Sequence, residues 1–356
     1  MSISHTNHSI CVRLAFLAVL MNPFGWFAAF AQHQPALTIT VPESMGRNPV
    51  AAFSPDGRQI ITGGSALTFW DAFTGERIQS YADDAISESI VCSPDGKLVA
   101  TAYLDYSSTV RMKIWNVEIG QCKHVLQYSL PKLQKGYFQS YAIGMAFSPD
   151  GKELLTGDVA TRFLSWSTET GQILREYHAL GSMRDPILGI LFLPDGNRAI
   201  VQRGLGEIYL VDLRSDAIIS TLPQQLGLSL SADGTLWLGT GSLGLELRRV
   251  ETGELVISYP VEYTMWLRLT DLSPDGRLIL VGGSDYQDDR LPRFILDTET
   301  GEVLREYGIC LDRVLKFAPD GKRFMAVTND DKQRVRIYDI SDLQAAVKEP
   351  SVEKQE

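Results

Sequence analysis

Hydrophobic and polar positions alternate along this 356-residue chain in short blocks of strand length. The first unit shows the pattern, with apolar runs at residues 50–54, 59–62, 66–70 and 77–81 separated by polar turns that contain glycine. Runs this short, rich in β-branched and aromatic residues, are typical of β-strands. Four such runs joined by tight turns predict one antiparallel, four-stranded unit.

One four-residue turn recurs seven times along the chain. Its commonest form is Ser-Pro-Asp-Gly, and its copies begin at Ser54, Ser93, Ser148, Leu193, Ser231, Ser273 and Ala318. Pro presets φ at one corner, Asp tolerates the next, and Gly adopts the left-handed conformation that closes the hairpin. Successive Asp-Gly steps are 38 to 55 residues apart, close to the roughly 40–50 residues of one β-propeller blade.

The repeat predicts an all-β fold, a seven-bladed β-propeller of four-stranded antiparallel blades over residues 32–343. The last unit supplies three strands, near residues 314–317, 323–327 and 334–338. Residues 37–41, Leu-Thr-Ile-Thr-Val, form a strand pattern with no unit of their own. We expect this N-terminal strand to pair with residues 334–338 as the outer strand of the last blade and so to close the ring.

These units resemble the WD-repeat family of β-propellers. The family's Trp-Asp dipeptide is complete at Trp70-Asp71. It keeps only the tryptophan at Trp115-Asn116 and Trp166-Ser167, and only the aspartate at Val211-Asp212, Leu296-Asp297 and Tyr338-Asp339. The fifth unit has Arg248-Arg249 there, and the family's Gly-His dipeptide is missing. The resemblance implies a divergent member, held by apolar packing more than by the family's Asp-His-Ser/Thr-Trp network. The Thr-Gly turns also resemble those of quinoprotein-like propellers, which leaves the superfamily open.

The first 31 residues have the features of a secretory signal peptide. They contain one base, Arg13, no acid, and an apolar run over residues 14–31 that ends in Ala-Phe-Ala. This pattern predicts cleavage before Gln32 and a secreted or periplasmic protein. An uncleaved membrane anchor is the alternative, because the run approaches the roughly 17–25 residues of a membrane span.

Charge and cysteine content narrow the classes of partner. The chain carries 33 basic and 43 acidic residues, a net charge of −10, which does not suit a nucleic-acid backbone. After cleavage we also expect no membrane association and a monomeric propeller, followed by a charged tail over residues 344–356. Cys92 and Cys122 fall on the predicted inner and outer strands of one blade, so we expect unbridged packing residues.

Candidate binding residues lie in the connections that do not repeat. Successive connections of an antiparallel blade alternate between its two ends, so the regular turns share one face and the irregular connections share the other. The candidates on that second face are Asp105, Tyr106, Tyr137, Arg184, Tyr263, Trp266, Asp285, Tyr286, Asp288, Asp289, Asp330 and Asp331. An acidic patch with aromatic edges would receive a basic loop or peptide of a protein partner. Solvated loop carboxylates are the alternative interpretation, and a calcium site would require a ligand spacing that neither Asp run has.

Sequence motifs for catalysis are missing. The chain has no Gly-x-Ser-x-Gly, phosphate loop, His-Glu-x-x-His or Cys-x-x-Cys, and only His124 and His178 lie within the repeats. The family resemblance therefore implies a non-catalytic interaction module, for which we expect no metal and no cofactor. The alternative is a small-ligand binder or enzyme that uses the mouth of the central channel, as quinoprotein-like propellers do.

Overall fold

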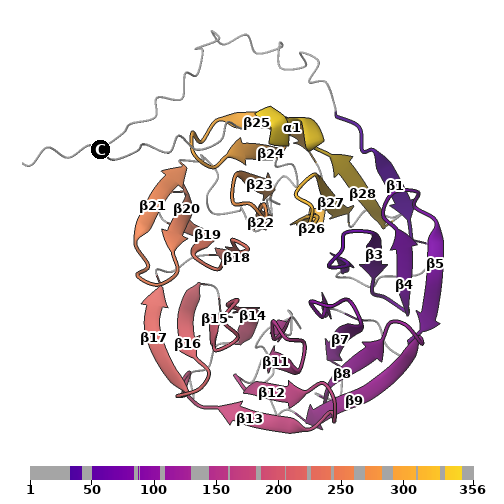
Figure 1. Cartoon of the computed structure of the whole chain (residues 1–356), viewed down its shortest axis with the longest axis vertical. Helices are drawn as coiled ribbons and strands as arrows, with labels where there is room; N and C mark the ends of the chain where they lie inside the picture. The colour runs from indigo at the N-terminus through magenta and orange to yellow at the C-terminus, as the bar shows by residue number, and fades with distance from the viewer. Residues whose placement is uncertain are drawn as a thin grey trace, which may run out of the picture.

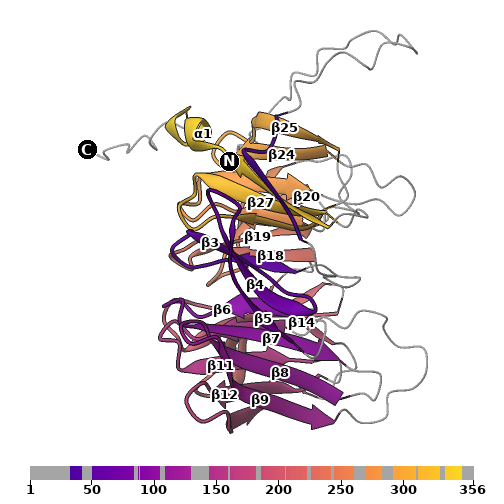
Figure 2. The same ribbon diagram turned by 90° about the vertical axis from the view of Figure 1, so that its right-hand side faces the viewer.

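The computed structural model describes residues 33–41, 50–83, 87, 89–104, 109–129, 144–158, 161–181, 186–204, 206–222, 226–241, 244–259, 269–282, 292–309, 312–328 and 333–346. In this part of the chain, seven four-stranded antiparallel sheets form the blades of a ring (Figure 1). The predicted all-β, seven-bladed propeller is confirmed. From the side, the strands run between the two faces of the disc (Figure 2).

Each blade runs from an inner strand at the channel to an outer strand at the rim. Blades 1 and 2 are β2 (Ala51–Phe53), β3 (Gln59–Thr62), β4 (Ala66–Asp71), β5 (Arg77–Ala82) and β6 (Ser89–Cys92), β7 (Leu98–Leu104), β8 (Thr109–Asn116), β9 (Gln121–Ser129). Blades 3 and 4 are β10 (Gly144–Phe147), β11 (Glu153–Gly157), β12 (Phe163–Ser167), β13 (Ile173–Tyr177) and β14 (Ile187–Phe192), β15 (Arg198–Arg203), β16 (Glu207–Asp212), β17 (Ala217–Leu222).

The remaining blades follow the same order. Blades 5 and 6 are β18 (Leu226–Leu230), β19 (Leu236–Gly241), β20 (Gly244–Arg249), β21 (Leu255–Tyr259) and β22 (Leu269–Leu272), β23 (Leu278–Gly282), β24 (Pro292–Asp297), β25 (Val303–Ile309). Blade 7 is β26 (Asp312–Phe317), β27 (Arg323–Thr328), β28 (Arg334–Asp339) and β1 (Leu37–Thr40). A short helix that the sequence pattern did not predict, α1 (Ser341–Ala346), follows β28.

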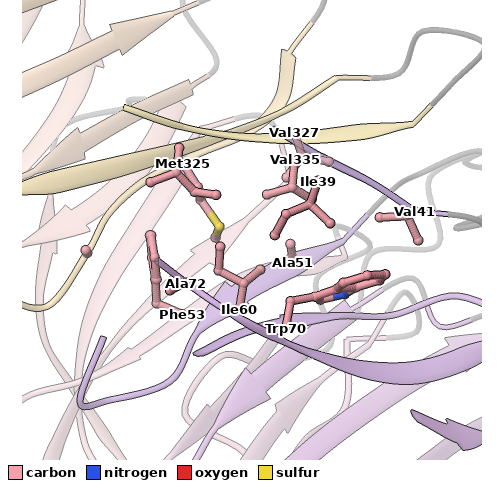
Figure 3. Packing of buried hydrophobic residues seen from close by; sticks show 12 residues of the cluster. Ile39, Val41, Ala51, Phe53, Ile60, Trp70, Ala72, Met325, Val327 and Val335 are labelled. Carbon is pink, nitrogen blue, oxygen red and sulfur yellow. The ribbon is translucent and has the colours of Figure 1, made fainter. Parts of the chain in front are cut away.

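The ring closes as predicted, because β1 pairs antiparallel with β28, from Leu37 opposite Ile337 to Thr40 opposite Arg334. Ile39 of β1 is buried against Val327 and Val335 of blade 7 (Figure 3). The same apolar cluster includes Ile60 and other residues of blade 1. The N-terminal strand thus joins the two blades at which the ends of the chain meet.

A bulge between the third and fourth strands recurs in each of blades 1 to 6. The extra residue lies on the outer strand, and in four blades it is an exposed aliphatic side chain: Ile78, Leu174, Ile219 and Val256. A bulge twists a sheet edge and interrupts its row of hydrogen-bonding groups. The apolar rim is therefore a poor template for the addition of a further strand.

The second strands are buried on both faces, as their apolar sequences predict. One polar contact repeats among them in blades 1 to 3. The indole N–H groups of Trp70, Trp115 and Trp166 donate to the hydroxyls of Thr62, Thr101 and Thr156 at 2.9, 3.1 and 2.9 Å. These blades thus keep the Thr-Trp contact in the absence of the family's Gly-His dipeptide.

The prediction for the cysteines is half right. Cys92 and Cys122 lie on the inner and outer strands of blade 2 and are unbridged. Cys92 packs against an apolar cluster, and its burial raises the pKa of the thiol to about 12. Cys122 is exposed, so the prediction of a packing role is wrong there, because an outer strand has no neighbouring strand on its rim side. Among the described residues, no helix has the length and apolar character of a membrane span.

Candidate functional site

All twelve binding residues predicted from the sequence lie outside the residues that the structure describes: Asp105, Tyr106, Tyr137, Arg184, Tyr263, Trp266, Asp285, Tyr286, Asp288, Asp289, Asp330 and Asp331. The strands that lead to these connections are described, for example β7, which ends at Leu104, and β8, which begins at Thr109. We call this end of the blades the loop face. The opposite end is the turn face, formed by the turns that contain Gly57, Gly96, Gly151, Gly196, Gly234, Gly276 and Gly321.

On the turn face, the serine and aspartate of the first turn bind one another and the backbone. Ser93 donates its hydroxyl to Asp95 Oδ1 at 2.7 Å and accepts the backbone N–H of Leu98 at 2.9 Å. The Ser93 hydroxyl and the backbone N–H of Lys97 lower the pKa of Asp95 below its ordinary value of 3.8. The same serine–aspartate hydrogen bond occurs in the turns at Ser54, Ser148, Ser231 and Ser273.

The two turns that lack serine hold their aspartate with an arginine. Leu193 and Ala318 replace the serine. In these blades, Arg198 donates to Asp195 at 2.6 Å and Arg323 donates to Asp320 at 2.8 Å. Each arginine is the first residue of the second strand, five positions after the missing serine. Both guanidinium groups also reach the next blade, to Glu251 and to Gly57 respectively.

A cavity of about 320 Å³ lies on the turn face between blades 4 and 5. We call it the seam cavity; its lining is Leu193, Pro194, Asp195, Arg198, Asp233, Gly234, Thr235, Arg249 and Glu251. Its volume is at the lower end of the roughly 300–1,000 Å³ typical of ligand pockets. Arg198 spans its lining, between Asp195 and Glu251. The ion pairs, with Glu251 first, raise the pKa of Arg198.

Near the loop face, described acidic side chains are already paired. Asp83 is buried and accepts a hydrogen bond from Lys113 of the neighbouring blade at 2.5 Å. Asp158 is buried as well and accepts the hydroxyl of Tyr128 at 2.8 Å. Burial, followed by the charge of Asp158, raises the pKa of Tyr128. Asp83 therefore links two blades.

The wall of the central channel is polar in one sector. The comparison is at the position before the last residue of each inner strand. There β2, β6, β10 and β14 carry Ala52, Val91, Ala146 and Leu191, whereas the three following inner strands carry Ser229, Asp271 and Lys316. Asp271 is buried, and its Oδ1 accepts both the Ser229 hydroxyl at 2.9 Å and the Lys316 ammonium at 2.7 Å. The backbone N–H of Phe317 donates to its other oxygen at 2.8 Å. Asp271 thus cross-links three blades with its acceptors already engaged.

The described residues contain no group of three or more His, Cys, Asp or Glu side chains that could hold a metal ion. No family model matches the chain. A stretch of 117 residues is 32% identical to WD repeat-containing protein 90 of Mus musculus, and it spans 32% of this chain and 6% of that protein.

The fold has a counterpart among solved structures. The crystal structure of the Myceliophteria thermophila Cps50 (Swd1) β-propeller domain matches with a TM-score of 0.69 at 13% sequence identity, over 86% of this chain and 99% of that domain. The chain is a β-propeller, and part of it is similar in sequence to a WD-repeat protein. The agreement in fold extends over nearly the whole of the solved domain, whereas the sequence match is local.

In this propeller, the second residue at the position of the Trp-Asp dipeptide caps the second turn of the blade. Asp71 Oδ1 accepts the backbone N–H groups of Phe73 and Thr74, both at 2.8 Å. In every other blade except blade 5, the equivalent residue makes such bonds too. These residues are Asn116, Ser167, Asp212, Asp297 and Asp339. Blade 5 has Arg249 there, and its side chain lines the seam cavity.

Sequence reasoning placed the binding site on the loop face and did not identify the seam cavity of the propeller. Two sequence signals were available. Arginine occurs at the start of the second strand only in the two units whose turn lacks serine, as Arg198 and Arg323. The fifth unit alone replaces the turn cap with a base, Arg249. Their connection depends on contacts between neighbouring blades, which a repeat pattern does not contain.

Proposed function

We propose that this propeller is a non-catalytic interaction module that binds a protein or peptide partner through its loop face. The observation that carries the proposal is the contrast between the two faces. On the turn face, the carboxylates of Asp56, Asp95 and Asp150 are engaged by serine hydroxyls and backbone N–H groups. Side chains that hold a turn in this way have little freedom to bind a partner.

The sequence of the loop face has the opposite character. Its connections differ from blade to blade and contain aromatic and acidic residues, among them Tyr286 and the aspartates at 285, 288 and 289. Variable loops on a rigid scaffold are common places for recognition. With a net charge of −10, the molecule favours approach of a basic partner, and aromatic side chains supply contact area.

The location of the protein belongs to the same proposal. A signal peptide over residues 1–31 would deliver the propeller to the periplasm or the cell exterior. N-terminal sequencing of the protein purified from its native host tests this step. A mature chain that begins at Gln32 supports it, whereas an intact Met1 in the membrane fraction contradicts it.

Affinity capture with two matched variants tests the binding face. One variant replaces Asp285, Asp288 and Asp289 with Asn, and the control replaces Glu76, Glu118 and Glu302, all exposed on the turn face, with Gln. Both remove three negative charges. We expect a partner captured by the native protein to bind the first variant at least about tenfold more weakly at low salt and to bind the control normally.

Two outcomes would contradict the proposal. A partner that binds both variants equally well would place recognition away from the acidic loops. Capture of a small molecule that is lost on substitution of Lys316, with no protein partner, would favour the channel-binding alternative. Lys316 is the group to vary because its side chain is 47% exposed in the polar sector of the channel wall.

A further inference from the structure

Neighbouring blades of the ring are joined by one recurrent contact. At several junctions, a side chain of one blade donates to the carbonyl oxygen of the residue that follows the Trp-Asp position in the next blade. Tyr81 donates to Val117 O at 3.3 Å, Arg175 donates to Leu213 O at 2.7 Å, and Tyr259 donates to Thr298 O. These carbonyls lie at the junction between blades, so a donor from the adjacent blade satisfies them.

The junction of blades 7 and 1 shows the contact in its fullest form. Arg323 donates to Ala72 O at 3.2 Å and to Gly57 O at 2.6 Å, and its guanidinium lies 4.1 Å from the centre of the Phe73 ring. One arginine thus satisfies two carbonyls of the next blade and stacks on an aromatic ring. Such a planar donor with several N–H groups suits paired acceptors.

The junction of blades 4 and 5 contains the equivalent acceptors without the donor. Gly234 and Val250 occupy the positions of Gly57 and Ala72, and both are buried. Among the described residues, neither carbonyl oxygen accepts a hydrogen bond. Arg198, the equivalent of Arg323, donates to Asp195 as Arg323 does to Asp320. Its other partner is Glu251, which stands where blade 1 has Phe73, instead of the two carbonyls.

The outer strand of blade 4 does not supply a replacement. Its residue equivalent to Arg175 is Ser220, as the pairings of Arg175 with Ser165 and of Ser220 with Leu210 show. The Ser220 hydroxyl is buried and has no hydrogen-bond partner among the described residues. The seam cavity lies at this junction. Gly234 lines it, and so do Arg249 and Glu251, the two chain neighbours of Val250.

We propose that the seam cavity receives an arginine side chain from a partner protein, which supplies at this junction the donors that Arg323 supplies between blades 7 and 1. Charge favours a cationic occupant, because three carboxylates, Asp195, Asp233 and Glu251, line the cavity against two guanidinium groups. Of the latter, Arg198 is paired within the cavity, and Arg249 lies 3.9 Å from Glu254. The Gly234 and Val250 carbonyls would accept the N–H groups of the incoming side chain.

The surroundings fit an arginine flanked by apolar residues. Ile218 and Ile219 at the rim of blade 4 and Val256 at the rim of blade 5 are exposed. These side chains lie on the outer strands of the two blades that meet at the cavity, β17 and β21. A partner segment whose arginine enters the cavity would cover them with its own apolar side chains. This surface is on the turn face and its rim, so it is separate from the proposed loop-face site.

Short peptides test the proposal on the purified protein. The probes are acetyl-Leu-Arg-Leu-amide and the same peptide with citrulline, which keeps the shape of arginine but lacks its charge. We expect the arginine peptide to shift the amide NMR signals of Gly234 and Thr235 in a saturable manner. The citrulline peptide should bind at least about tenfold more weakly, because a charge-assisted hydrogen bond is lost.

Two substitutions make the test specific. Glu251→Phe recreates the arrangement of blade 1 and releases Arg198 to occupy the cavity as Arg323 does, so peptide binding should be lost. Glu118→Phe places the same side chain at the equivalent position of blade 2 and should bind the peptide normally. Because Glu251 has an exposed side chain, the variant should fold; Glu251→Gln, which removes only the charge, should weaken binding as well.

Three results would overturn the proposal. They are the lack of any shift at Gly234 with millimolar arginine peptide, equal binding of the citrulline peptide, and undiminished binding to Glu251→Phe. Sedimentation completes the test. A dimer of the native chain that the arginine peptide dissociates would make the occupant a second copy of this chain and would exclude a separate partner. None of these results depends on the loop-face aspartates, so failure here leaves the proposed function open to its own test.

Discussion

At the scale of single residues, two recurring polar groups of this propeller have a partner in each blade where they are described: the tryptophan indole of the third strand and the aspartate of the first turn. Where a blade has a tryptophan on its third strand, a threonine of the second strand accepts its N–H. This threonine lies two positions beyond the residue paired with the tryptophan, as Thr156 does for Trp166. Where the first turn lacks serine, an arginine replaces it as the partner of the aspartate. At these two positions, the repeat keeps a hydrogen-bond partner for the polar group even where the identity of the partner residue changes.

Removing the threonine hydroxyl should destabilise a blade. Thr156→Val keeps the shape of the side chain but leaves the buried indole N–H of Trp166 without an acceptor. We expect a loss of about 1–3 kcal/mol in the free energy of unfolding, measured by urea denaturation. Thr156→Ser, which keeps the hydroxyl, should lose less. In a Trp166→Phe background the valine substitution should cost little, and an equal cost in both backgrounds would contradict the assigned role of the contact.

At the scale of elements, the first turn both closes a hairpin and packs against the turn of the preceding blade. Its glycines have φ between +67° and +72°, which only glycine adopts readily. In most junctions the proline of one turn lies near the glycine of the next. Blade 5 has Ala232 in place of that proline. Among the described residues other than its chain neighbours, Gly276 of blade 6 has no atom within 4 Å of an added Cβ, while Gly234 faces Pro194.

Gly234 and Gly276 therefore form a matched pair for substitution. Both have a φ of +72°, so alanine suffers the same backbone strain at each position, about 1–2 kcal/mol. At Gly234 the new Cβ would lie 2.4 Å from Pro194 Cδ, which adds a steric cost of about 1–3 kcal/mol. Denaturation should show Gly234→Ala to be the less stable variant. Equal losses would mean that the two turns move apart at no cost.

The turns should also contribute to the pH dependence of stability. The pKa of Asp95 is lowered in the folded state, so its ionised form favours folding above the ordinary value of 3.8, and this contribution is lost as the pH falls below that value. Asp95→Asn should therefore destabilise the protein at pH 7, and the difference from the native protein should shrink towards pH 3. Because Asp95 is more than half exposed, we expect an effect below about 1 kcal/mol. A difference in stability that stays constant between pH 7 and pH 3 would mean that the loss comes from the different hydrogen bonding of the substituted amide and not from the lost charge.

At the scale of the whole molecule, the sequence predicted what each unit determines locally. Seven Asp-Gly turns and short apolar runs were sufficient for the blade count, the strand order and the pairing of β1 with β28. Features that depend on contacts between blades were missed, including the exposure of Cys122, the link from Lys113 to Asp83 and the seam cavity. A repeat pattern gives the contents of a blade, but the neighbour that a side chain meets depends on how two blades pack.

Closure of the ring provides a final test at this scale. Because β1 is contributed by the opposite end of the chain, its side chains stabilise the junction of blades 7 and 1 as well as their own sheet. Ile39→Ala should cost about 2–5 kcal/mol, as expected for a buried isoleucine, whereas Thr38→Ala, at an exposed position of the same strand, should cost little. Deletion of residues 37–42 should cost several kcal/mol, on a scale of about 1 kcal/mol for each hydrogen bond plus apolar burial. Unchanged thermal unfolding of the deletion variant would show that blade 7 closes with three strands. The remaining contacts between blades 7 and 1, among them those of Arg323 with Gly57 and Ala72, would then be sufficient to hold the two ends of the ring together.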